Sequence, residues 1–201
     1  RIAADFMGHE NNVCVVAPNA EGITKARKFQ WAIEEAVPEK DVSFATYFHF
    51  DHFGSGPSDP KRFANLNSAP VQYRDVLIVD DLIDTAGTVA ELSRKLRAQG
   101  ASKVFAVAGH GIFSHDALEA LAKAPVERVY VTDSIPAPTA TTALAQAGLA
   151  KLEYISIAEN LADLIRQEFR RSNQIFFDAK EDDEDDFAVE NDDQKVSTSD
   201  D

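Results

Sequence analysis

The amino-acid sequence predicts an α/β domain with a mostly parallel sheet flanked by helices. Short apolar, β-branched runs alternate with helix-forming segments along most of the chain, which is the pattern of βαβ units. The run at 76–79 is apolar at every position, as expected of a strand that is covered on both faces. Ligands of such sheets bind beyond the carboxyl ends of the strands, so functional residues are expected in the strand-to-helix connections.

Each expected element has a local justification in the sequence. Residues 13–16 form a short apolar run that ends before Pro18, which indicates a buried strand followed by a turn. Gly100 is a typical stop for the helix expected at 88–99. Residues 51–70 are rich in Gly, Pro, Ser and Asn and predict a long loop. The remaining expected elements are strands at 42–50, 104–107, 126–131 and 152–157 and helices at 23–35, 115–122 and 158–171.

Charge and composition set the domain organisation and exclude several classes of protein. Residues 174–201 hold twelve acidic residues and two lysines, so they carry −10 of the net charge of −14. Like charges at this density oppose compaction, so we expect a globular domain at 1–173 and a disordered acidic tail at 174–201. The acidic balance argues against a nucleic-acid partner. No apolar run approaches the ~20 residues of a membrane span, which argues against a membrane partner. Cys14 is the single cysteine, which favours a reducing compartment, the cytoplasm.

The most informative segment joins the strand at 76–79 to the following helix. Two adjacent carboxylates end the strand, and small residues then offer backbone N–H groups and hydroxyls where the helix begins, which suits a phosphate group. The carboxylates would repel a phosphate but suit sugar hydroxyls or a bridging cation. The segment therefore predicts a site for ribose 5-phosphate, and capping of the helix alone would need fewer acids. The residues expected to bind this ligand are Asp80, Asp81, Asp84, Thr85, Ala86, Gly87 and Thr88.

Four segments resemble those of a known family. Asp-Asp-Leu-Ile-Asp-Thr-Ala-Gly-Thr at 80–88 resembles the phosphoribosyl-diphosphate loop of the type I phosphoribosyltransferase fold, and more narrowly that of ribose-phosphate diphosphokinases, also called phosphoribosyl-diphosphate synthetases. Segments 16–27, 109–114 and 131–136 resemble further signatures of this family, in the same order. The resemblance implies a type I phosphoribosyltransferase-like fold and the C-terminal domain of a synthetase subunit. It also implies an enzyme of nucleotide biosynthesis that transfers diphosphate from ATP to ribose 5-phosphate with Mg²⁺, as a homo- or hetero-oligomer of synthetase subunits.

The sequence also departs from the family pattern. Asn19 stands where the family has a metal-binding aspartate, so it is a degraded metal ligand, and Glu21 replaces a glycine. Residues 47–53 contain no Lys or Arg where the family has a catalytic pair, so no catalytic residue is assigned. Because the resemblance covers only the C-terminal domain, we expect a chain that lacks the N-terminal one. Two alternatives stay open: a catalytically impaired regulatory subunit similar to the synthetase-associated proteins, and a phosphoribosyltransferase.

Overall fold

The computed structural model describes residues 2, 11–49, 63–65 and 70–185. Contacts divide the chain into two units, Arg1–Ser156 and Ile157–Asp201, which are described separately here. The first unit is an α/β domain in which strands and helices alternate, so the predicted fold class is confirmed.

The sheet of the first unit has the strand order β3-β2-β1-β4-β5-β6-β7, in which all neighbours are parallel except β3, which runs antiparallel to β2. Strand β3 lies in the segment predicted to be a loop, so that prediction was wrong at these three residues. The outer edge of β2 offers unpaired backbone groups, and a strand pairs there without needing an apolar pattern of its own. The strands are β1 (Val13–Ala17), β2 (Val42–His49), β3 (Phe63–Asn65), β4 (Asp75–Ile83), β5 (Lys103–Gly111), β6 (Arg128–Thr132) and β7 (Leu152–Ile155).

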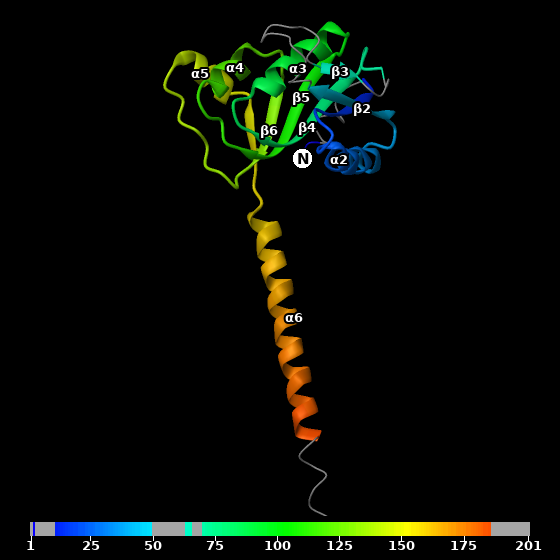
Figure 1. Cartoon of the computed structure of the whole chain (residues 1–201), viewed down its shortest axis with the longest axis vertical. Coiled ribbons are helices and arrows are strands. Elements are labelled where there is room, and N and C mark those ends of the chain that lie inside the picture. The colour runs from blue at the N-terminus through cyan, green and yellow to red at the C-terminus, as the bar shows by residue number, and fades with distance from the viewer. Residues whose placement is uncertain (1, 3–10, 50–62, 66–69, 186–201) are drawn as a thin grey trace, which may run out of the picture. The chain divides into compact units, whose positions relative to one another are not determined.

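Helices cover both faces of this sheet. The helices are α2 (Ile23–Ala36), α3 (Gly87–Ala98), α4 (Ala117–Lys123) and α5 (Ala143–Leu149). Helix α2 packs on one face with the side chains of Leu77 and Val79, whereas α3, α4 and α5 pack on the other with Val76 and Ile78 (Figure 1). Successive residues of β4 therefore point to opposite faces, as a strand requires.

Helix α5 was not predicted from the sequence. Its seven residues are too few to show a helical period, and Gly148 inside it resembles a helix breaker. In the structure Gly148 instead allows a close approach to α4, because a Cβ atom there would lie 1.8 Å from the carbonyl oxygen of Leu118. The hydroxyl of Thr142 starts the helix by accepting a hydrogen bond from the N–H of Ala145 at 3.0 Å.

Strands β4 and β5 continue past the strands on either side of them. Pairing of β4 with β1 ends at Ile78, and pairing of β5 with β6 ends at Ala108. The ladder between β4 and β5 continues to Ile83 and Gly111. The predicted strand at 76–79 was therefore too short, since both carboxylates after it lie within β4.

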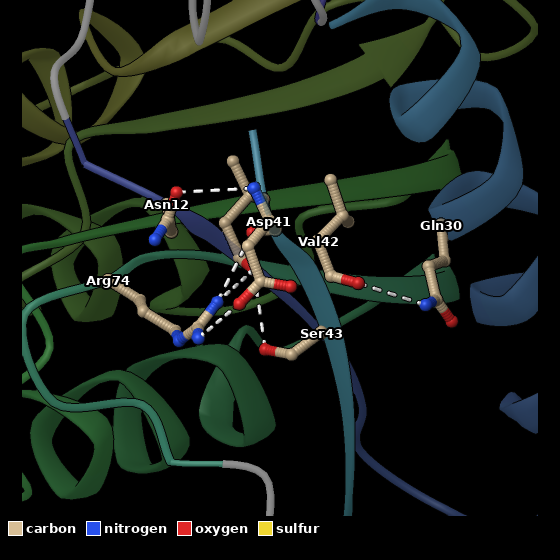
Figure 2. Close-up of polar contacts among 7 residues, drawn as sticks. Asn12, Gln30, Asp41, Val42, Ser43 and Arg74 are labelled. Atoms are coloured by element: carbon tan, nitrogen blue, oxygen red, sulfur yellow. Dashed lines mark hydrogen bonds and ion pairs between the residues drawn. The ribbon is translucent and has the colours of Figure 1, made fainter. Parts of the chain in front are cut away.

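A polar network joins β1, β2 and β4 at the amino ends of these strands (Figure 2). The guanidinium of Arg74 lies 2.5 Å from the carboxylate of Asp41 and donates hydrogen bonds to the backbone oxygens of Asp41 and Val13. The side chain of Gln30 in α2 donates to the backbone oxygen of Val42 at 3.1 Å. These bonds satisfy backbone groups at the end of the sheet opposite the candidate site.

The second unit contains the helix α6 (Ala158–Asp185). The helix predicted at 158–171 was too short, because no Gly or Pro interrupts the helical pattern before residue 185. The predicted boundary at residue 174 therefore falls within α6, and residues 186–201 lie outside the described part of the chain. Among the described residues, no helix is long and apolar enough to cross a membrane.

Candidate functional site

A small cavity lies where β4 leads into α3. It measures about 150 Å³ and is lined by Asp80 and by residues 82–89. Helix α3 begins at Gly87 with no side-chain cap and no acidic residue in its first turn, so its first N–H groups face no competing protein anion on their own helix. Ala86 precedes it in the left-handed conformation, with φ 59°, and is buried. These features fit the phosphate-binding loop that the sequence predicts at 84–88, and phosphate binding itself stays a prediction.

The two adjacent carboxylates at the end of β4 lie in different environments. Both carboxylates line a larger cavity together with Lys25 and Lys28 of α2, and Asp80 also lines the small cavity beside α3. Asp81 forms an ion pair of 2.7 Å with Lys25 in α2. The cavity beside α3 is lined by Asp80 but not by Asp81. The structure thus brings Asp80 together with the predicted loop residues and holds Asp81 beside it.

The two carboxylates differ in pKa because Asp80 is the more buried of the two and Asp81 is paired with Lys25. Burial is the largest cause that raises the pKa of Asp80 to about 6, and the negative charge of Asp81 adds to the effect. The Asp80 carboxylate accepts a hydrogen bond of 2.9 Å from the N–H of Asp81, which opposes the rise. The hydrogen bond from Lys25 lowers the pKa of Asp81. Asp80 therefore carries the proton of the pair when the pH falls.

A second cavity, of about 380 Å³, adjoins the first and shares Asp80 with it. Lys25, Lys28 and Phe29 of α2 line one side, and His110 of β5 lines another. The ring of His110 is held by Ser134, whose hydroxyl lies 2.7 Å from Nδ1. Asp81 lines this cavity too and is paired with Lys25, so a ligand that extends past Asp80 would meet side chains of both charges. Sequence reasoning did not assign Lys25, Lys28 and Phe29 to the site, and for His110 it left open a site-lining role and a packed, hydrogen-bonded one.

Asn19 and the segment 47–53 are the remaining positions singled out by the sequence. Asn19 lies in the connection between β1 and α2, where its amide oxygen accepts a hydrogen bond of 2.7 Å from the N–H of Gly22. It lines neither of the two cavities described above. Tyr47 is buried, and the other side chains of the segment 47–53, where the family has its catalytic pair, lie outside the described residues.

The first unit is thus an α/β domain with a largely parallel sheet, with Asp80 and the start of α3 lining a cavity at the carboxyl end of β4. Residues 66–177 match the family model of the phosphoribosyl synthetase-associated domain, and the chain belongs to this family. The family expected from the sequence motifs is confirmed.

Known proteins support the same assignment. The chain is 35% identical to the ribose-phosphate pyrophosphokinase of Bifidobacterium longum over 164 residues, which are 82% of this chain and 44% of that protein. It is 30% identical to the enzyme of the same name from Haemophilus influenzae over 163 residues, 78% of this chain and 44% of that protein. The crystal structure of phosphoribosylpyrophosphate synthetase from Mycobacterium smegmatis superposes with a TM-score of 0.65 at 25% identity, covering 85% of this chain and 50% of that one. The chain thus spans about half the length of the relatives it matches.

Proposed function

We propose that this chain forms the ribose 5-phosphate-binding part of a ribose-phosphate diphosphokinase, which makes phosphoribosyl diphosphate for nucleotide biosynthesis. The observation that carries the proposal is the loop at 84–88, with its uncapped helix start and with Asp80 beside it. The names of the relatives and the family membership support the same activity.

In the proposed reaction the C1 hydroxyl oxygen of ribose 5-phosphate attacks the β-phosphorus of ATP. The bond between this phosphorus and the oxygen that bridges it to the α-phosphorus breaks, AMP leaves with that oxygen, and the proton of the attacking hydroxyl is released to water. The loop amides would hold the 5-phosphate, and the Asp80 carboxylate would accept hydrogen bonds from ribose hydroxyls. Lys28 in the adjoining cavity would face the polyphosphate, and Lys25 would do so only by exchanging its ion pair with Asp81 for the ligand. Positioning and charge neutralisation then provide most of the catalysis.

Magnesium is part of the proposed reaction. Among the described residues, no group of three or more His, Cys, Asp and Glu side chains is arranged to hold a metal ion. Asn19 is neutral, and its oxygen already accepts the hydrogen bond from Gly22. Mg²⁺ in phosphoryl-transfer sites is usually held by one or two carboxylates together with substrate phosphates. Asp80 fits this role, and the bound ion would offset negative charge on the transferred diphosphate.

The proposal includes further synthetase subunits or domains as partners, in a homo- or hetero-oligomer. Because the chain spans about half of its relatives, residues from elsewhere in the protein or in another subunit would complete the ATP site. Cys14 is a free and buried thiol, and we propose a cytoplasmic location, where unpaired cysteines are ordinary.

Calorimetric titration with ribose 5-phosphate tests the proposal. We expect the chain to bind this ligand, and Asp80→Asn to weaken binding by about 10-fold or more, because an amide accepts hydrogen bonds from hydroxyls less strongly than a carboxylate does. Glu127→Gln is a matched control on an exposed residue that lines neither cavity. Equal affinity of the wild type and Asp80→Asn would refute the assignment of the site.

A catalytically impaired regulatory subunit is the second candidate. The neutral Asn19 and the lack of Lys and Arg at 47–53 favour it. A radiolabelled ATP assay on the full-length gene product separates the two functions. Transfer of diphosphate to ribose 5-phosphate would establish the enzyme, whereas binding without turnover would establish the regulatory subunit.

A further inference from the structure

The connection between β5 and α4 is hydrogen-bonded to the start of the predicted phosphate-binding loop. The N–H groups of Ile112 and Phe113 both donate to the backbone oxygen of Ile83, at 2.9 and 3.3 Å. The N–H of Ser114 donates to the backbone oxygen of Asp84 at 3.1 Å. Backbone hydrogen bonds from residues 112–114, which follow β5, therefore hold the backbone of residues 83 and 84 in place.

The path of this connection depends on a close fit between two residues. Phe113 adopts the left-handed conformation, with φ 53°, and its ring is buried. The ring covers Gly111, where a Cβ atom would lie 2.3 Å from Cε2 of Phe113. Gly111 thus makes room for the ring, and the turn at Phe113 then brings Ser114 to Asp84.

The side chains of Ser114 and Asp84 are also joined. The Ser114 hydroxyl donates a hydrogen bond to Oδ1 of Asp84. Nδ1 of His115 lies 3.0 Å from the same hydroxyl oxygen. A hydroxyl has one proton and the carboxylate can only accept, so the hydroxyl proton goes to Asp84, and His115 donates from Nδ1 to Ser114. The chain of bonds therefore runs from His115 through Ser114 to Asp84.

The Asp84 carboxylate lies in the cavity expected to hold the phosphate, so its orientation affects phosphate binding. The residues that line the small cavity include two carboxylates, Asp80 and Asp84, and no Lys, Arg or His. An Asp84 carboxylate free to turn toward the loop amides would occupy or repel the place of a phosphate. We propose that Ser114 is a positioning residue of the ribose-phosphate site, which holds the Asp84 carboxylate aside so that the loop amides stay open to the phosphate. This inference rests on the proposed function.

A double-mutant cycle tests this role. We expect Ser114→Ala to weaken the affinity for ribose 5-phosphate by about 10-fold, the order expected for loss of a hydrogen bond to a charged group. In a chain that carries Asp84→Asn, we expect the same Ser114→Ala change to alter the affinity less than about 2-fold, because the charge that needed restraint is gone. A merely structural role of Ser114 would weaken binding equally in both backgrounds, and that result would overturn the proposal.

A matched pair of variants covers the case in which Ser114→Ala does not fold. Ser114→Thr keeps the hydroxyl and Ser114→Val replaces it with a methyl group of similar size, so we expect only the valine variant to lose affinity. Equal affinities for the two would overturn the proposal.

Inorganic phosphate is titrated as a second ligand. If the chain binds phosphate but not ribose 5-phosphate, the proposed function is refuted, and the double-mutant cycle can still be measured with phosphate. If the wild type binds ribose 5-phosphate but the effects of Ser114→Ala and Asp84→Asn on its affinity are additive, only the role of Ser114 is refuted.

Discussion

Replacing Asp80 with asparagine should stabilise the folded chain at neutral pH while weakening its ligand site. Burial raises the pKa of Asp80 from 3.8 to about 6, so ionisation of this group opposes folding. For a fully buried group this rise corresponds to about 3 kcal/mol. Asp80 is only partly buried, and solvent screening reduces the cost to about 1–2 kcal/mol. Asparagine has a similar shape without the charge, so we expect a gain of that size in the free energy of unfolding at about pH 7.5.

The sign of the pH dependence makes this prediction specific. Between pH 3.8 and about 6 the folded state binds more protons at Asp80 than the unfolded state does, so the stability of the wild type falls as the pH rises through this window. The gain from Asp80→Asn should therefore be full above about pH 6 and should disappear toward about pH 4. Urea unfolding of both proteins across this range measures it. A loss of stability at neutral pH, or a gain that does not change with pH, would refute the reasoning.

Three further substitutions test other parts of the structure. Lys25→Met removes the ammonium that lies 2.7 Å from Asp81, so the pKa of Asp81 should rise. Carbon-13 NMR titration measures this pKa, and an unchanged value would show that the ion pair does not form in solution. Gly148→Val places atoms against the backbone of Leu118 and should lower the free energy of unfolding by about 1–3 kcal/mol, with Ala147→Val as the exposed control. Arg74→Met should cost about 1–2 kcal/mol in the same urea assay because it removes the ion pair with Asp41 and one of the donors to each of two backbone oxygens, and unchanged stability would contradict this.

The order of strands and helices was predictable because it depends on local patterns. The apolar run at 76–79 and the stop at Gly100 each identify one element by themselves. Helix α5 has no such pattern, since its justification is the contact of Gly148 with Leu118 from another helix. Strand β3 likewise exists through pairing with β2, which no local pattern encodes.

The composition of the site was predictable, but its geometry was not. The small residues at 84–88 indicate a phosphate loop from the local sequence alone, without knowledge of the tertiary fold. The different surroundings of Asp80 and Asp81, of which only Asp80 lines the small cavity beside α3, depend on how β4 packs against α2 and α3. The roles of Lys25 and Ser114 depend on contacts with residues at least 30 positions away in the sequence, Asp81 and Asp84. Such contacts come from the tertiary fold.

The continuation of β4 and β5 beyond their neighbours has a consequence for dynamics. Past Ala108 the two strands form a two-stranded ribbon, and Leu82 and His110 pair there with each other and, among the described residues, with no further strand. A ribbon whose edges pair with no further strand opens locally at a lower free energy than the centre of a sheet. Backbone amides of the ribbon should therefore exchange with deuterium faster than those of Leu77 and Val107 in the interior. A bound ligand would slow this exchange, so hydrogen exchange would report occupancy of the site independently of turnover.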